Sequence, residues 1–111
     1  MTFIRIATVI ASLAALAPAS SMAADGKALY DKNCKKCHSI EAGKHGLGPS
    51  LAGIFGKKAG EQDFKKYKNL KGADITWDEA NLSAWIEDPK GFIGKPTTMI
   101  VKVKDAEDRA A

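Results

Sequence analysis

The hydrophobic and polar positions divide the chain into an apolar leader and a longer region with helical patterning. Residues 6–17 are almost wholly apolar and follow a start that carries one positive charge, Arg5. Residues 21–23 read Ser-Met-Ala, which offers a signal peptidase the small side chains that it recognises. The apolar run is also too short to span a membrane comfortably. We therefore predict a secretory signal peptide at residues 1–23 and an exported domain at residues 24–111.

Two stretches of the exported domain have apolar residues at helical spacing. Residues 25–39 begin with an aspartate that can cap a helix, and apolar side chains recur along one side. A second helix is predicted to start at the capping box of residues 76–79, and it ends at Asp88 because Pro89 follows. Residues 64–70 are predicted to form a shorter helical turn.

The remaining segments are predicted to be loops. Residues 43–60 contain six glycines and Pro49, and a second loop with glycine and proline follows Pro89 up to Thr98. Residues 101–104 alternate like a strand, but the segment is too short to pair with anything. Helices joined by irregular loops predict a single all-α domain.

Composition narrows the classes of function. The chain has 111 residues and a formal net charge of +4, carried mainly by lysine. An exported domain with one remaining arginine and no aromatic-basic motif is not expected to bind nucleic acid, whereas a basic face for an acidic protein partner stays open. A domain this short buries little apolar surface, so it needs a disulfide, a metal or a cofactor to stabilise its fold.

Both cysteines and one of the two histidines lie within five consecutive positions, from Cys34 to His38. Four chemistries use such a cluster: a redox disulfide, a zinc site, a covalent haem, and a pair of structural thiols. On a helix, Cys34, Cys37 and His38 stand at i, i+3 and i+4 and share one face, which suits a flat haem bonded at two edge points. Zinc needs four converging ligands, and a thioredoxin-like pair would be expected in a βαβ setting. We therefore predict haem bound through both thiols, with His38 on the iron.

The second axial ligand is predicted by elimination. Met1 and Met22 leave with the leader, so Met99 is the remaining methionine, in a turn flanked by glycine and lysine. A lone methionine is otherwise most often core filler, but the haem motif favours ligation. A thioether ligand stabilises ferrous iron and raises the redox potential. His45 is the competing ligand, although it follows His38 so closely that reaching the opposite face of the haem would need a wide detour.

With these features the chain resembles a class I c-type cytochrome of the mitochondrial and bacterial c2 type over residues 25–99. The resemblance implies an all-α fold of few helices and irregular loops wrapped around one covalent haem c. It is carried by an ordered series of motifs: Cys34-Lys-Lys-Cys37-His38, Gly48-Pro49-Ser50-Leu51, Gly53-Ile54-Phe55-Gly56, Ile75-Thr76-Trp77, Glu87-Asp88-Pro89-Lys90 and Pro96-Thr97-Thr98-Met99.

The resemblance also implies roles for individual residues around the cofactor. The carbonyl of Pro49 would accept a hydrogen bond from the ring of His38, which makes the imidazole a stronger donor and fixes its plane. Further haem contacts are implied at four positions, with Trp77 and Tyr67 bonded to a propionate and Thr97 or Thr98 seating the methionine loop.

Three features depart from the family pattern. Lys57 stands where many members have an arginine near the propionates, and Trp85 stands where many have a tyrosine facing the methionine sulfur. Family members also close with a long C-terminal helix. Asp105 could cap such a helix here, but so few residues follow that we expect either a truncated chain or other residues that cover Gly26 and Tyr30.

The predicted function is a periplasmic electron carrier rather than an enzyme, because an iron with two protein axial ligands leaves no position for substrate. One electron at a time would pass between respiratory or photosynthetic complexes, and lysines would steer acidic partners. A monomer without stable membrane insertion is expected. The alternatives are a haem sensor or peroxidase-like enzyme with an open iron site, and a thiol-disulfide oxidoreductase. The candidate docking lysines are Lys36, Lys44, Lys90 and Lys95.

Overall fold

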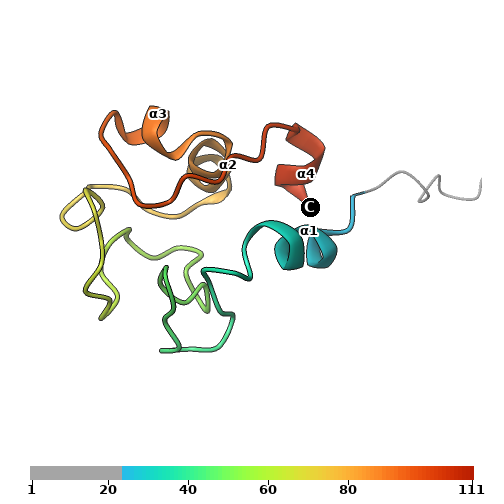
Figure 1. Ribbon diagram of the computed structural model, residues 1–111. Coiled ribbons are helices and arrows are strands. Elements are labelled where there is room, and N and C mark those ends of the chain that lie inside the picture. Colours follow the sequence, from blue (N-terminus) through green and yellow to red (C-terminus); the bar gives the residue numbers. More distant parts are fainter. Residues whose placement is uncertain (1–23) are drawn as a thin grey trace, which may run out of the picture.

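The computed structural model describes residues 24–111, so the predicted signal peptide lies outside the described residues. This part of the chain forms four helices: α1 (Gly26–Asn33), α2 (Glu79–Glu87), α3 (Pro89–Ile93) and α4 (Ala106–Ala110). Within the same part there is no β-strand, only an isolated antiparallel bridge between Lys58 and Thr76. Figure 1 shows α1 and the loops that follow it on one side, with α2, α3 and α4 on the other. The predicted all-α architecture is confirmed, and no helix in the described region is long and apolar enough to cross a membrane.

The first helix is shorter than predicted. Asp25 caps α1 as expected by accepting hydrogen bonds from two amides of the first turn. The helix ends at Asn33, and the chain continues in turns. The amides of Cys37 and His38 both donate to the carbonyl of Cys34, at 3.1 and 3.0 Å. The first of these bonds spans three residues and the second spans four, so a single turn of mixed 3₁₀ and α geometry follows α1 and carries Cys37 and His38.

The start of α2 differs from the predicted capping box. Asp78, not Thr76, is the cap, and its carboxylate accepts a hydrogen bond of 2.7 Å from the amide of Asn81. Thr76 is held in the extended bridge with Lys58, and its carbonyl accepts from the side-chain amide of Asn81 at 2.9 Å. The bridge therefore moves the start of the helix past Thr76. The end of the helix, just before Pro89, agrees with the prediction.

Helix α3 lies in a segment predicted to be loop. Pro89 occupies its first turn, where the missing amide proton costs nothing. Asp88 ends α2 and also caps α3, accepting from the amide of Gly91 at 3.2 Å. Gly94 closes α3 in the left-handed conformation, with φ 68°. Asp88 therefore ends α2 and begins α3.

The predicted helical turn at residues 64–70 is absent, and these residues form turns and bends. Asn69 has φ 64°, in the left-handed region that interrupts an α-helix. Its side-chain amide donates to the carbonyl of Pro96 at 2.5 Å. This hydrogen bond ties the segment to the loop that carries Met99.

The apolar core of residues 24–111 is small. Its buried members are Ala59, Trp77 and Trp85, and the two indole rings lie 5.6 Å apart between centroids. Half-buried apolar side chains surround them, while other large apolar side chains are exposed. The half-buried apolar side chains around the core are Ile54, Leu70, Ile75, Leu82, Ile86, Phe92, Ile93 and Met99.

The C-terminal end of the chain reaches the first helix. Asp105 caps α4, as predicted, by accepting from the amides of Glu107 and Asp108. A Cβ atom built on Gly26 would lie within 2.8 Å of the carbonyl carbon of Ala111. The short α4 therefore contacts α1 at Gly26, whose cover had been in question, and it also contacts α2.

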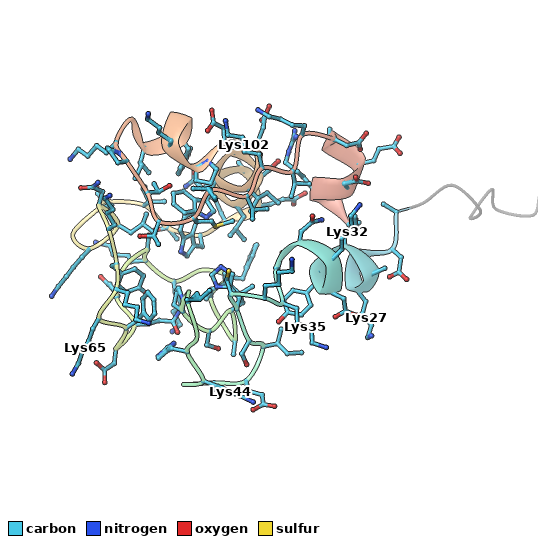
Figure 2. All side chains as sticks on the ribbon, in the orientation of Figure 1. Lys27, Lys32, Lys35, Lys44, Lys65 and Lys102 are labelled. Atoms are coloured by element: carbon cyan, nitrogen blue, oxygen red, sulfur yellow. The ribbon has the colours of Figure 1, made fainter. Side chains whose placement is uncertain are left out.

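Lysines form the basic surface. In Figure 2, Lys27 and Lys32 lie on α1 and Lys35 lies in the turn after it, whereas Lys44 and Lys65 project from the loops. Some form exposed ion pairs, such as Lys27 with Asp31 at 3.4 Å and Lys44 with Glu41 at 3.6 Å. Pairs of this kind contribute about 0–1 kcal/mol to stability, so the lysines contribute little to holding the fold together.

Candidate functional site

The imidazole of His38 is held by the loop that follows it. Its Nδ1 atom lies 2.7 Å from the carbonyl oxygen of Pro49. A carbonyl oxygen only accepts hydrogen bonds, so Nδ1 carries the proton and Nε2 keeps a free lone pair for a metal. A Cβ atom on Gly48 would lie 2.3 Å from Cε1 of the ring, so only glycine fits against this imidazole.

Backbone contacts fix this loop on both sides of the histidine. The hydroxyl of Tyr30 donates to the carbonyl of His38 at 2.9 Å, and the amide of Gly48 donates to the carbonyl of Cys37 at 2.8 Å. Ser50 is fully buried, and its hydroxyl donates to the carbonyl of Glu41 at 2.6 Å. Sequence reasoning assigned no contact to the Tyr30 hydroxyl or to Ser50, because neither residue type signals a long-range hydrogen bond.

The two cysteines are half-buried free thiols at the end of α1. Burial, and then the neighbouring Cys37, raise the pKa of the Cys34 thiol above its ordinary value. Nucleophilic thiols of disulfide oxidoreductases have lowered pKa values instead. The environment of Cys34 therefore differs from that of a redox-active thiol.

His45, the competing ligand, is occupied within the loop. Its Nδ1 atom accepts a hydrogen bond of 2.9 Å from the amide of Ser50. Its ring packs against Phe64, with centroids 5.6 Å apart. This is the local hydrogen bond that a loop histidine commonly makes, and it leaves His38 as the better-placed imidazole.

Met99 packs against the buried tryptophan cluster and is itself half-buried. The hydroxyl of Thr97 donates to the carbonyl of Met99 at 2.7 Å, whereas Thr98 is exposed. Of the two threonines considered from the sequence, Thr97 is therefore the one that contacts the methionine backbone. The hydrogen bond from Asn69 to the Pro96 carbonyl also holds this loop, and the sequence did not suggest it.

The two aromatic residues considered as propionate partners lie in different surroundings. Trp77 is buried beside Trp85, and its amide donates to the carbonyl of Lys57 at 2.8 Å. Tyr67 is half-buried, with its ring edge-on to Phe64 at 5.0 Å. Burial raises the pKa of the Tyr67 hydroxyl, and hydrogen bonding to Gln62 opposes that shift. A protonated hydroxyl is thus available as a donor.

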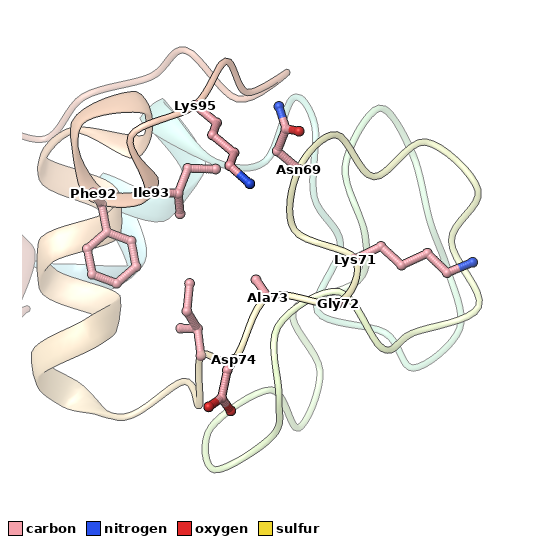
Figure 3. Close-up of a pocket in the computed structure, with 9 residues that line it drawn as sticks. Asn69, Lys71, Gly72, Ala73, Asp74, Phe92, Ile93 and Lys95 are labelled. Atoms are coloured by element: carbon pink, nitrogen blue, oxygen red, sulfur yellow. The ribbon is translucent and has the colours of Figure 1, made fainter.

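A cavity of about 370 Å³ opens between residues 69–75 and α3. Figure 3 shows Phe92 and Ile93 on one wall, with the Lys95 side chain extending toward the opening and Lys71 pointing away. Ile75, Phe92 and Ile93 are also among the half-buried apolar side chains that surround the core. Apolar side chains near the methionine loop are thus left incompletely covered by the protein itself.

These features fit a covalently bound haem. Two thiols are separated by two residues, one imidazole has a free Nε2 atom, and one half-buried thioether packs against the tryptophan core. Haem c uses this donor set: thioether links to the porphyrin edge and nitrogen and sulfur ligands for iron. Among residues 24–111 there is no group of three or more His, Cys, Asp or Glu side chains placed to hold a bare metal ion.

Comparisons with known proteins agree with this donor set. The family model for cytochrome c matches residues 23–110. Cytochrome c2 iso-2 of Magnetospirillum fulvum is 44% identical over 79 residues, which span 70% of this chain and 82% of that protein. Cytochrome c2 of Rhodomicrobium vannielii is 35% identical over 114 residues, which span 99% of this chain and 90% of that one.

A solved structure supports the same assignment at the level of the fold. Cytochrome cH from Methylobacterium extorquens aligns with a TM-score of 0.69 at 34% identity, covering 79% of this chain and 89% of that one. The chain therefore belongs to the cytochrome c family as a class I c-type cytochrome of the c2 type, an electron carrier rather than an enzyme, with haem c bound covalently through its cysteine pair.

Proposed function

We propose that this protein is a periplasmic one-electron carrier whose haem iron is bound by His38 and Met99. The observation that carries the proposal is the hydrogen bond between His38 Nδ1 and the Pro49 carbonyl, which leaves Nε2 free to face a metal. Met99 is the thioether of residues 24–111, and it is half-buried against the tryptophan cluster.

Each residue of the site has a distinct role in this proposal. Cys34 and Cys37 form the thioether links, and the bond to Pro49 keeps the His38 ring in one plane and increases its basicity. The bound haem supplies one-electron chemistry between ferrous and ferric iron. Thr97 holds the Met99 backbone by its 2.7 Å hydrogen bond. Trp77, Tyr67 and Thr98 are the remaining candidates for contact with the haem or its propionates.

The leader supports the location that we propose. Residues 1–23 combine a short charged start, an apolar run and small residues before the expected cleavage site. Cleavage would release residues 24–111 into the periplasm as a monomeric carrier. Amino-terminal sequencing of the mature protein tests this step, and retention of residues 1–23 in an exported protein would contradict it.

The partners that we propose are acidic redox proteins. Lys36, Lys44, Lys90 and Lys95 are exposed, and positive charge near the docking face raises the rate of encounter with a negative partner. The partners would be the donor and acceptor complexes of a respiratory or photosynthetic chain. Nucleic acid is not expected as a partner.

Attachment and ligation can be tested on one preparation, made in a host that matures c-type haem. Haem should stay with the polypeptide through denaturing electrophoresis and acid–organic extraction, whereas Cys34→Ser combined with Cys37→Ser should release it. The oxidised protein should show the weak near-infrared band of a sulfur–iron bond, and the reduced protein should resist carbon monoxide. Extractable haem would overturn attachment, and ready binding of carbon monoxide would favour a sensor or a peroxidase-like enzyme.

A further inference from the structure

Arg109 is the arginine of the described chain, and its side chain is unusually enclosed for a residue near a terminus. The side chain is 12% exposed. Nε donates to the hydroxyl of Ser83 at 3.1 Å, and Nη1 donates to the carbonyls of Val103 and Lys104 at 3.1 and 2.8 Å. Nη2 lies 3.6 Å from a carboxylate oxygen of Glu87. One guanidinium therefore joins α4, α2 and the segment between Met99 and α4.

The geometry of these contacts requires a guanidinium. Ser83 and Glu87 stand four residues apart on α2, so they present their oxygens on one face of the helix. The two carbonyls belong to the segment that leads into α4, and both accept from Nη1. A planar fork with five donors can reach all of these groups at once, whereas a lysine ammonium cannot.

Five residues of α4, Ala106–Ala110, are described, and their contacts with the rest of the domain can be named one by one. Besides its Asp105 cap, α4 has the Arg109 contacts to α2 and the backbone contact with Gly26 of α1. Arg109 therefore accounts for most of the polar attachment of α4 to the rest of the domain.

The segment that Arg109 binds is the one that follows Met99. Residues 100–104 connect Met99 to α4, and Val103 is bonded directly to α2 and, separately, to Arg109 of α4. The amide of Val103 donates to the carbonyl of Ile86 at 2.7 Å, and the carbonyl of Val103 accepts from Arg109. Both backbone polar groups of Val103, its amide and its carbonyl, are thus hydrogen-bonded, four residues after the methionine.

We propose that Arg109 is a positioning residue that keeps Met99 in place by fastening the chain that follows it. The inference rests on the proposed function, because it takes Met99 as the axial ligand. When the guanidinium fork is lost, the segment of residues 100–104 opens more often, and the methionine leaves the iron more often. The apparent affinity of an external ligand is proportional to the fraction of molecules in that open state.

The test uses the mature holoprotein, with imidazole as the external probe. Arg109→Lys keeps the positive charge but removes the guanidinium hydrogen bonds. The affinity for imidazole should then rise about tenfold, which is the size expected when charge-assisted hydrogen bonds are lost. Amide exchange of Val103 should quicken by a similar factor. Lys104→Gln is the matched control because it removes a charge from the same segment while keeping its carbonyl, and its affinity should stay within about twofold of the parent.

Two further variants distinguish a wrong role for Arg109 from a wrong axial assignment of Met99. Ser83→Ala removes one acceptor of the fork and should give a smaller rise, so it also provides the test if Arg109→Lys does not fold. Unchanged imidazole affinity and unchanged Val103 exchange in both variants would overturn the role of Arg109. If Met99→Ala leaves the imidazole affinity unchanged, the axial assignment fails instead, and faster Val103 exchange in Arg109→Lys would then show a fastening role confined to the backbone.

Discussion

His38 and Pro49, 11 positions apart, are joined by a 2.7 Å hydrogen bond between the imidazole Nδ1 and the proline carbonyl. The bond selects one tautomer, so the orientation of the ring and the location of its proton are set before any metal binds. The loop between the two residues holds its shape through Ser50 and Gly48 rather than through regular structure.

Gly48→Ala should disturb this arrangement. The new methyl group would lie 2.3 Å from Cε1 of His38, so the ring or the loop must move, at a cost of about 1–3 kcal/mol. We expect a lower unfolding temperature and a weakened histidine–iron bond, measured by thermal unfolding and resonance Raman spectroscopy. Gly46→Ala is the control, since its methyl group would meet the Cys37 carbonyl oxygen at 3.1 Å and should cost less. Equal behaviour of the two variants would contradict the close approach of Gly48.

Met99→Ala should lower the redox potential, because the thioether stabilises ferrous iron. The near-infrared band of the oxidised protein should disappear, and carbon monoxide should bind to the reduced protein. Ile100→Ala is the matched control, since Ile100 is 82% exposed and adjacent. If the alanine variant at Met99 keeps the band and the potential, the sixth ligand is another group.

Thr97→Val should weaken retention of the methionine loop, because it removes the hydroxyl that donates to the Met99 carbonyl at 2.7 Å. A neutral hydrogen bond contributes about 0.5–1.5 kcal/mol, so we expect the near-infrared band to bleach at a lower denaturant concentration. Thr98→Val, at an exposed position, should leave that midpoint nearly unchanged. The reverse order of the two variants would show that Thr98 seats the loop.

Much of the site follows from short-range spacing. The cysteine and histidine positions need only local geometry, and the lone methionine of residues 24–111 is identified by elimination. The hydrogen bond between His38 and Pro49 required the resemblance to a family, because the intervening loop is rich in glycine and has no periodic pattern to fix its path. The axial roles of His38 and Met99 stay predictions until the iron is examined.

The predictions that were wrong concern residues whose roles are decided by tertiary contacts. The segment after Pro89 was predicted to be loop, but Pro89 begins α3, which Asp88 caps. Thr76 fits a capping box, yet its pairing with Lys58 keeps it extended. Asn69 lies within a lysine-rich stretch where nothing marks a left-handed residue. The Arg109 contacts span up to 26 positions and have no local signal.

Asp88 should make stability depend on acid pH. A hydrogen bond from the Gly91 amide, with Lys102 and Lys104 nearby, holds the pKa of its carboxyl below the usual value. A folded-state pKa below the unfolded value of about 3.9 stabilises the protein above that pH, and the contribution is lost as pH falls through the folded pKa. Asp88→Asn should therefore unfold at a lower temperature at pH 7, and the difference from the parent should vanish in strong acid.

Asp25→Asn, at the cap of α1, serves as the control for removing one negative charge. Thermal unfolding at a series of pH values measures both variants. A constant gap between the parent and Asp88→Asn at every pH would assign the effect to packing rather than to ionisation.

Electron transfer to an acidic partner should slow as salt rises, because the range of a charge falls to about 10 Å at 0.1 M salt. Changing Lys90 or Lys95, both exposed, to glutamate should reduce the association rate more than it changes the redox potential. Lys27→Glu on α1 is the control for net charge. Stopped-flow kinetics across salt concentrations measures the effect, and a rate indifferent to salt would place the contact elsewhere.

The small core has a consequence for how the protein is made. Among residues 24–111 the buried apolar side chains are Ala59, Trp77, Trp85 and Pro89, whereas Ile40, Leu47 and Phe55 are each at least 65% exposed. A domain of this size is marginally stable without an additional stabilising link, so the stability of the folded state depends on the attached haem. A variant that loosens the pocket should therefore lower the yield of mature protein as well as its melting temperature. The precursor should therefore be only partly folded when the haem is attached. The tertiary structure should form around the haem afterwards.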